Sequence, residues 1–178
     1  MEEFRRVFKE FVEWQIANNP VNNFGGYFNP EKNPLGFIIF FILMWITISY
    51  FLAVFGGWRR LSQVYKRIDV FNGKVLSFQS GTLGNVSYGN AISVGANQKE
   101  LFLGMFFIFK VGHPDLVIPL TEVTGREIKR FIFLKYVELN FKEVPRKSLQ
   151  ITKKLADFIV TESNQSWKYD TLQTDKGK

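Results

Sequence analysis

The sequence of 178 residues contains no cysteine and a single histidine, His113. The lack of cysteine excludes disulfide bonds, thiol nucleophiles and zinc or iron–sulfur sites with cysteine ligands. The single histidine excludes a metal site built from several histidines. We therefore expect neither a metal nor a cofactor.

The sequence also lacks the short motifs that carry enzymatic chemistry. It has no G-x-S-x-G, no H-E-x-x-H and no D-x-D-x-D loop. Gly84 and Gly89 have the spacing of a phosphate loop, but Asn90 and Ala91 stand where that loop needs a lysine and a hydroxyl residue. We expect these glycines to lie in turns and bulges between strands, and we expect the protein not to be an enzyme.

No charged residue occurs between Leu35 and Gly57, a run of 23 residues. As a helix with a rise of 1.5 Å per residue, this run would be about 34 Å long, enough for a hydrocarbon core of about 30 Å. A signal peptide is shorter, lies nearer the N-terminus and ends in small residues. We predict a retained transmembrane helix over residues 35–58, with Trp58 at the membrane interface. A helix buried in a soluble core is the alternative.

Basic residues are concentrated after the apolar run. Residues 1–34 carry four basic and five acidic side chains, whereas residues 59–178 carry 19 basic and 11 acidic ones. The first basic set follows the run directly and consists of Arg59, Arg60, Lys66 and Arg67. The positive-inside rule places the part after the run in the cytoplasm, and we expect this set to contact the anionic membrane surface. A merely solvated basic surface is the alternative. Since no nucleic-acid-binding motif is present, we expect no nucleic-acid partner.

The segments that flank the apolar run differ in character. Residues 2–16 have the periodicity of an amphipathic helix, which could lie on the membrane or pack on a protein. Residues 18–34 are a linker rich in Asn, Gly and Pro. The predicted organisation is an N-terminal helix and linker (1–34), a transmembrane helix (35–58), a β domain (59–162) and a flexible tail (163–178).

Short strands are predicted after residues 58–67, which are expected to prolong the helix. The predicted strands are Val75–Gln79, Ala91–Val94, Leu101–Phe109, Leu116–Leu120, Glu127–Leu134 and Tyr136–Phe141. The third is a buried central strand by its apolar composition, and Pro119 confines the fourth to a sheet edge or a strand end. Turns are predicted at 72–73, 95–97, 112–115 and 124–125. A helix with an i, i+4, i+7, i+8 apolar stripe is predicted over Ser148–Thr161, with Ser148 as its cap.

The order of elements resembles a pleckstrin-homology-like domain, including the related GRAM type, in bacterial membrane proteins with one span. The resemblance rests on ISVGANQKELFLGMFFIFKVGHPDLVIPLTEVTG, then YVELNF, then SLQITKKLADFIV, and it covers residues 70–162. It implies an α+β fold, in which an antiparallel β-barrel or sandwich is closed by a C-terminal helix. Members that bind inositol phosphates use basic residues on the first strands. Because Lys74 is the only cation between Lys74 and Ala91, we expect no specific phosphoinositide site.

We expect a membrane-anchored cytoplasmic binding or scaffold module without catalytic activity, in contact with the lipid bilayer and a protein partner. A second basic set is the candidate partner-binding surface and consists of Arg126, Lys129, Arg130 and Lys135. Two alternatives remain. The chain is an accessory subunit of a larger membrane complex, or it is a membrane-tethered enzyme that uses His113, which lies beside Asp115 in a turn.

Overall fold

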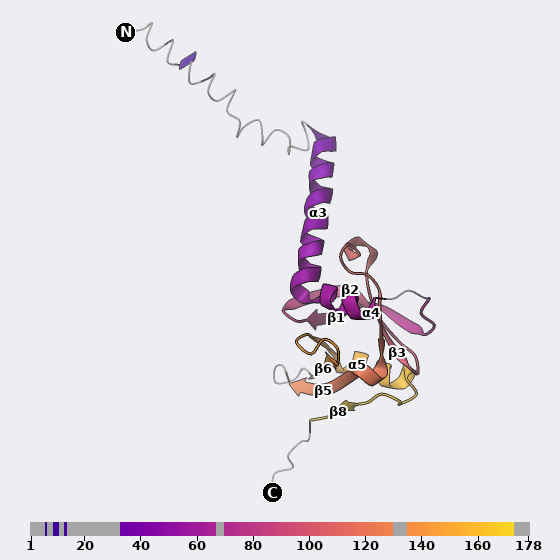
Figure 1. Ribbon diagram of the computed structural model, residues 1–178. Helices are drawn as coiled ribbons and strands as arrows, with labels where there is room; N and C mark the ends of the chain where they lie inside the picture. The colour runs from indigo at the N-terminus through magenta and orange to yellow at the C-terminus, as the bar shows by residue number, and fades with distance from the viewer. Residues whose placement is uncertain are drawn as a thin grey trace. The chain divides into compact units, whose positions relative to one another are not determined.

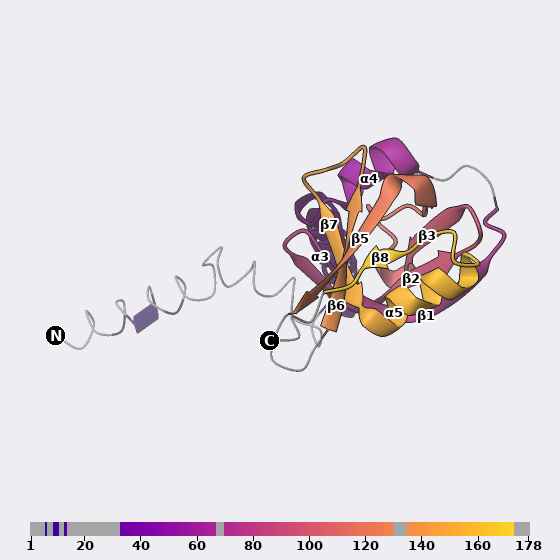
Figure 2. The same ribbon diagram turned by 90° about the horizontal axis from the view of Figure 1, so that it is seen from below.

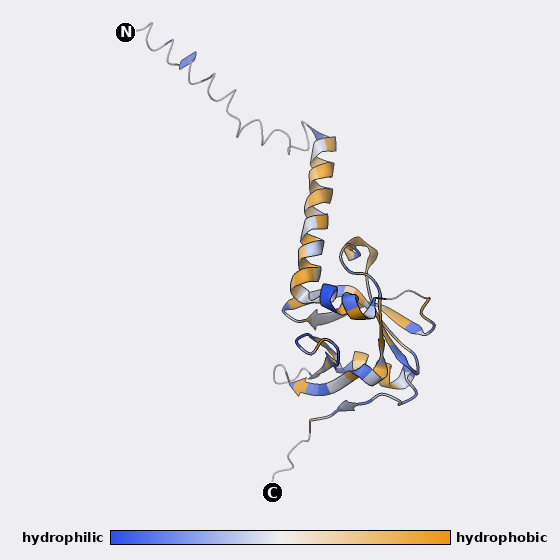
Figure 3. Ribbon diagram, in the orientation of Figure 1, coloured by the Kyte–Doolittle hydropathy of each residue, from blue (hydrophilic) through white to orange (hydrophobic). Residues whose placement is uncertain are grey.

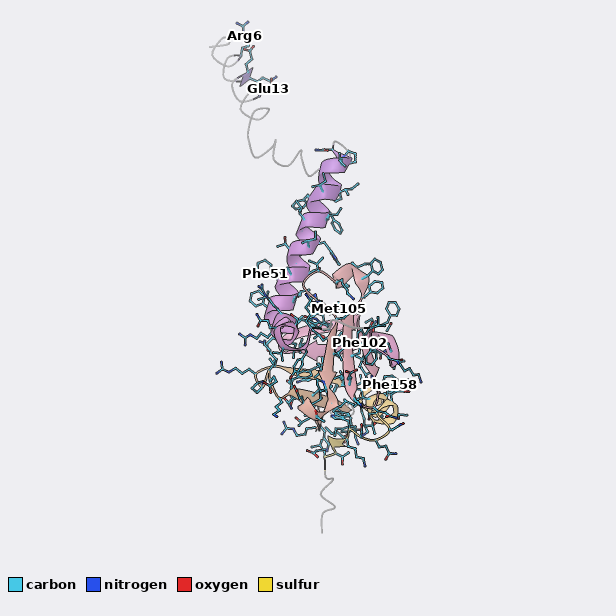
Figure 4. The ribbon with its side chains drawn as sticks, turned by 45° about the vertical axis from the view of Figure 1, so that its right-hand side comes forward. Arg6, Glu13, Phe51, Phe102, Met105 and Phe158 are labelled. Atoms are coloured by element: carbon cyan, nitrogen blue, oxygen red, sulfur yellow. The ribbon has the colours of Figure 1, made fainter. Side chains whose placement is uncertain are left out.

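The computed structural model describes residues 33–66, 70–129 and 135–172, together with Arg6, Lys9, Glu10 and Glu13 (Figures 1 and 4). Most of the predicted N-terminal helix and linker therefore lies outside the described residues. Lys9 and Glu13 are helical and form an exposed ion pair of 3.8 Å, one turn apart. The chain divides into two compact units, residues 1–47 and 48–178.

Helix α3 (Pro34–Gly56) begins in the first unit and ends in the second. The Asn33 side chain caps it by accepting the Gly36 N–H at 3.0 Å, and Pro34 takes the first helical position. An 18-residue window of α3 has a mean hydropathy of 2.5, and only 11% of that window is buried. Orange, apolar residues cover most of its length in Figure 3. Of the described helices, α3 alone is long and apolar enough to cross a membrane, and its composition also suits a signal sequence.

The second unit contains a curled sheet of eight strands, a half-barrel, with a helix near its C-terminal end (Figures 1 and 2). One antiparallel meander consists of β1 (Lys74–Leu83), β2 (Val86–Ala96), β3 (Glu100–Met105) and β4 (Leu116–Pro119). A second consists of β5 (Val123–Lys129), β6 (Lys135–Phe141) and β7 (Ser148–Thr152). The short strand β8 (Tyr169–Asp170) pairs with β5 in parallel, so that the strand order is β4-β3-β2-β1-β7-β6-β5-β8.

Strand β1 joins the two meanders. Its last residues, Gly81 to Leu83, pair with β2 on one side and with β7 on the other. Gly81 lies at this crossing, and a Cβ there would come within 3.2 Å of the Gln150 carbonyl oxygen. Two irregularities in the β1–β2 register, between Leu76 and Gly81, accompany the change of partner. Glycine and bulges of this kind let a strand bend at a barrel corner.

Two helices of the second unit contribute to the core of the half-barrel. Helix α4 (Trp58–Tyr65) lies against β4, and helix α5 (Lys153–Glu162) lies against β2, β6 and β7. The Tyr65 hydroxyl donates to Glu122 Oε2 at 2.8 Å, which fixes the end of α4 to the 3₁₀ turn η2 (Leu120–Glu122). Burial and this hydrogen bond raise the pKa of Tyr65 to about 12. The core side chains that α4 and α5 contribute are Trp58, Leu61, Tyr65, Leu155, Ala156 and Ile159.

Two strand predictions are confirmed to within one residue at one end. Strand β4 lies at one edge of the sheet and ends at Pro119, where the missing N–H costs no ladder hydrogen bond. Strand β6 buries Val137, Leu139 and Phe141, while the residues between them are half exposed, as the alternation predicts.

The predicted start of the last helix is wrong. Residues Ser148–Thr152 form strand β7, and α5 begins only at Lys153. Its cap is Thr152, whose hydroxyl accepts the Leu155 N–H at 3.4 Å. Leu149 and Ile151 are both buried, and their spacing of two residues is that of a strand. Over so few residues this pattern cannot be distinguished from the stripe of a helix.

Three further predictions need correction. The apolar run Leu101–Phe109 is a buried strand only as far as Met105, and the 3₁₀ turn η1 (Phe107–Phe109) follows it. The turn predicted at 124–125 lies inside β5, which begins at Val123, and residues 130–134 lie outside the described residues. The predicted tail is docked over its first part, because Trp167 is 4% exposed and β8 pairs with β5.

Candidate functional site

The last turns of α3 pack into the core of the second unit through a group of residues that we call the junction: Leu52, Trp58, Tyr88 and His113. Gly57 separates α3 from α4 with a φ of 100°, a left-handed conformation that glycine adopts without strain. The turn directs Trp58 inward, where its side chain is fully buried and its indole N–H donates to the Pro114 carbonyl at 2.9 Å. Trp58 is thus a core residue, and the prediction that it lies at the membrane interface is wrong.

Three rings of the junction pack edge to face. The centroid of His113 lies 5.3 Å from that of Trp58 and 5.6 Å from that of Tyr88. Trp58 and Tyr88 are themselves 6.2 Å apart. Such tilted contacts each contribute about 0.5–1.5 kcal/mol beyond area burial. The rings come from α4, β2 and the segment between β3 and β4, so the junction holds three distant parts of the chain together.

A chain of hydrogen bonds runs through the same rings. His113 Nδ1 lies 3.1 Å from the Val111 carbonyl oxygen, which only accepts, so Nδ1 carries the proton. His113 Nε2 lies 3.2 Å from the Tyr88 hydroxyl, and that hydroxyl lies 3.1 Å from the Leu52 carbonyl oxygen of α3. Nε2 and this carbonyl oxygen are both acceptors when Nδ1 carries the proton, so they share the one hydrogen of the hydroxyl. Burial lowers the pKa of His113 and raises that of Tyr88 to about 12, so both groups are neutral at physiological pH.

The predicted catalytic role of His113 gains no support from this geometry. His113 is 1% exposed, and both of its ring nitrogens have partners inside the junction. Asp115 is engaged elsewhere, because Lys110 Nζ lies 2.7 Å from each of its carboxylate oxygens. Among the described residues, no group of three or more His, Asp or Glu side chains could hold a metal ion. The arrangement serves packing.

Further contacts fix the end of α3. Lys147 Nζ donates to the Phe55 carbonyl at 3.2 Å, which places a cation at the negative end of the helix dipole. Gly84 has a φ of 56°, and a Cβ there would lie 2.7 Å from the Gly56 carbonyl oxygen. The β1–β2 turn can approach the helix this closely only because residue 84 is glycine.

The first basic set is exposed where the structure describes it. Arg59, Arg60 and Lys66 are exposed, and Arg67 lies outside the described residues. The Arg59 guanidinium donates to the Tyr50 hydroxyl and lies 5.5 Å from the centroid of the Tyr50 ring. This pairing of a cation with a tyrosine at the end of an apolar helix is typical of a membrane–water interface.

The second basic set is partly neutralised by ion pairs across β5 and β6. Arg126 lies 3.4 Å from Glu138, and Lys135 lies 3.6 Å from Glu127. Lys129 is exposed and stands opposite Lys135 in the ladder. Arg130 lies outside the described residues. The cations of both pairs are exposed although their acidic partners are not, so Arg126 and Lys135 remain accessible to an acidic partner.

Glu127 is the centre of a network that the sequence did not reveal. Its side chain is 4% exposed and lies 3.8 Å from Lys153 Nζ at the start of α5. Lys153 donates to the Tyr169 hydroxyl at 2.6 Å, and that hydroxyl lies 2.5 Å from Asp157 Oδ1. The hydrogen bond to Tyr169 raises the pKa of Lys153. The network ties α5 and β8 to β5, which explains why the start of the predicted tail is docked.

The outer surface also carries a polar groove of about 460 Å³ over β1 and β7. Hydroxyl and amide side chains, among them Ser80, Ser87 and Gln150, line it, and Tyr136 is the one titratable group among the described residues that do so. The groove therefore has no acid–base pair for catalysis.

No family model, no curated protein and no solved structure matches this chain.

Proposed function

We propose that this chain is a single-pass membrane protein that holds a pleckstrin-homology-like β module against the cytoplasmic face of a bilayer and acts by binding. The observation that carries the proposal is the junction. Because the last turns of α3 are part of the core of the module, the module cannot move away from the end of the helix. A protein built in this way brings a folded surface to a fixed height at the membrane.

The low burial of α3 favours a span over a core helix. The helix of a soluble core is mostly buried, whereas the most apolar window of α3 is 11% buried. The exposed basic residues that follow it directly favour a cytoplasmic location of the module. Its continuity with the core of the module favours a retained helix over a cleaved signal sequence, since cleavage there would remove Leu52 from the junction.

The strand order supports the pleckstrin-homology-like assignment. Two antiparallel meanders meet through β1 and β7, and α5 packs on the sheet that they form. In the proposed arrangement the first basic set contacts anionic head groups, and the second basic set faces an acidic protein partner. The absence of an acid–base pair at His113 favours this binding role over the enzymatic alternative.

Charge reversal tests the two basic sets separately. The full chain with a C-terminal tag is extracted from its native membranes in mild detergent, and the retained anionic lipid and protein are quantified. The double variant Arg60→Glu, Lys66→Glu is expected to lower retained anionic lipid at least about fivefold, since each surface cation contributes about 1 kcal/mol. The double variant Arg126→Glu, Lys129→Glu is expected to release the protein partner.

The matched control is Lys142→Glu with Lys154→Glu, which makes the same change of charge at two other exposed lysines. The control is expected to retain both lipid and protein. If neither test variant differs from the control, the proposal is wrong. A partner that remains at fixed stoichiometry through both reversals would identify the chain as an accessory subunit of a larger complex instead.

A further inference from the structure

The segment between β3 and β4 exposes an unusual amount of apolar surface. We call residues 106–111 the aromatic loop; their sequence is Phe-Phe-Ile-Phe-Lys-Val. Phe107 is 73% exposed, Ile108 44% and Val111 40%. Exposed apolar residues scattered singly need no explanation, but a contiguous group in one loop marks a surface that is covered in the working protein.

Hydrogen bonds and an ion pair fix the conformation of the aromatic loop. The Phe109 N–H donates to the Phe106 carbonyl at 2.9 Å, and the Phe106 N–H donates to the Ala91 carbonyl at 2.8 Å. Lys110 closes the base of the loop through its ion pair of 2.7 Å with Asp115. His113, which belongs to the junction, holds the segment after the loop in place. The exposed residues of the loop are therefore attached to a fixed part of the module.

A second element adds an aromatic ring to the same surface. Phe78, in a bulge of β1, has a φ of 58°, a left-handed conformation that is costly for a bulky side chain. The bulge turns its ring, which is 60% exposed, to within 5.2 Å of the Phe106 ring, and Phe106 lies 4.6 Å from Phe107. Strain that leaves an aromatic ring exposed does not serve the core, and strain of this kind concentrates at functional positions.

The position of the loop identifies what covers it. A Cβ on Gly112, directly after the loop, would lie 3.0 Å from Ala53 Cβ and 3.4 Å from the Tyr50 Cα of α3. Tyr50 precedes the end of α3 by six residues, about 9 Å along the helix axis. The uncharged run of about 34 Å exceeds a hydrocarbon core of about 30 Å by only a few ångströms, so this level of a spanning helix lies on the acyl-chain side of the boundary with the head groups. The pairing of Tyr50 with Arg59 marks the same level.

We propose that the aromatic loop and Phe78 insert into the interfacial layer of the same bilayer that α3 crosses, as a second membrane contact of the module. Aromatic rings are favoured near the head groups and the upper acyl chains, and the ion pair with Asp115 leaves Lys110 with a partner there. Two contacts at separate points of the module would fix its rotation about the helix axis as well as its height. The inference rests on the proposed function in one respect, which is that α3 spans the membrane.

The lack of cysteine makes the test direct, because one introduced cysteine carries the only label. The full chain is reconstituted into vesicles of phosphatidylcholine and phosphatidylglycerol, with an environment-sensitive fluorophore on Phe107→Cys or Val111→Cys. Both positions are exposed, so neither substitution removes a core contact. Quenchers attached to lipid at the upper acyl chain are expected to reduce the emission at least about threefold more than aqueous iodide does, as insertion at this depth requires.

Two control positions separate the outcomes. Leu172→Cys lies beyond β8, at the opposite edge of the sheet, and is expected to be quenched by iodide alone. Met44→Cys, within α3, is expected to be quenched by lipid alone. If Met44 is protected but the loop labels behave like Leu172, the loop inference is wrong and the proposed function stands. If Met44 is quenched by iodide, the proposed span itself is wrong. Loop labels shielded from both quenchers would show a protein contact and overturn the inference.

Discussion

Replacement of Tyr88 by phenylalanine tests the junction with the loss of a single atom. The ring that packs against Trp58 and His113 is kept, and only the hydroxyl that links His113 Nε2 to the Leu52 carbonyl oxygen is removed. Since the Val111 carbonyl holds the proton of His113 on Nδ1, Nε2 of the neutral ring is an acceptor. The Leu52 carbonyl oxygen and Nε2 share the one hydrogen of the Tyr88 hydroxyl, and the variant leaves Nε2 buried without a donor.

The expected cost follows from what the variant leaves behind. Since it removes one partner of a buried hydrogen bond and keeps the other, it incurs the cost of an unsatisfied buried acceptor, about 1–3 kcal/mol. His113 is 1% exposed, so water cannot replace the lost partner without opening the junction. We therefore expect Tyr88→Phe to lower the free energy of unfolding by about 2–3 kcal/mol. For a chain of this size, that change lowers Tm by about 4–12 °C.

The assay is thermal unfolding of the full chain in detergent, followed by near-ultraviolet circular dichroism. Tyr50→Phe is the matched control, because its side chain is 43% exposed and its hydroxyl meets Arg59 at the surface. The control is expected to change the free energy of unfolding by less than about 0.5 kcal/mol. A Tyr88→Phe variant as stable as the parent chain, or a control with an equal loss, would refute the account of the junction.

Three further predictions concern single positions in the second unit. Burial lowers the pKa of His113, so between its folded pKa and about 6.5 the unfolded chain binds a proton that the folded chain does not. The free energy of unfolding is expected to fall as the pH drops below about 6.5. His113→Gln should flatten this part of a plot of Tm against pH, and an unchanged slope would contradict the lowered pKa of His113. Gly84→Ala should lower the free energy of unfolding by at least about 2 kcal/mol in denaturant, because φ is 56° at this position and the new Cβ would meet the Gly56 carbonyl oxygen. Gly89→Ala is the control and should be nearly neutral, since no atom lies within 4 Å of its Cβ. Phe78→Gly should change the free energy of unfolding by less than about 1 kcal/mol, because relief of backbone strain offsets the lost ring contact. A loss of about 3–5 kcal/mol, as for a core phenylalanine, would show that the ring serves packing.

The sequence predicted elements whose signal is long or strictly periodic. The uncharged run predicted α3 nearly to the residue, and the alternation of Val137, Leu139 and Phe141 predicted β6. Strand β7 was missed because two buried residues in five suit a strand and a helix equally. The end of β3 was missed because hydropathy alone does not distinguish a buried phenylalanine from Phe107, which is exposed.

The junction could not be predicted, because its members are far apart in the sequence. Trp58 after an apolar run is typical of a membrane interface, and only the turn at Gly57 directs it into the core. His113 beside Asp115 suggested a catalytic pair, but Lys110 and Tyr88 engage the two side chains separately. Each of these contacts depends on the closure of the sheet, which local sequence patterns do not encode.

The proposed function requires that α3 crosses the membrane and holds the β module on the cytoplasmic side. Protease digestion of sealed vesicles of known orientation, with an epitope tag after Lys178, tests it most directly. We expect the uncleaved chain to stay in the membrane through alkaline extraction, and the tag to be removed only when protease has access to the cytoplasmic face. A tag removed from the opposite face would contradict the orientation, and a mature chain that has lost α3 or leaves the membrane would contradict the span.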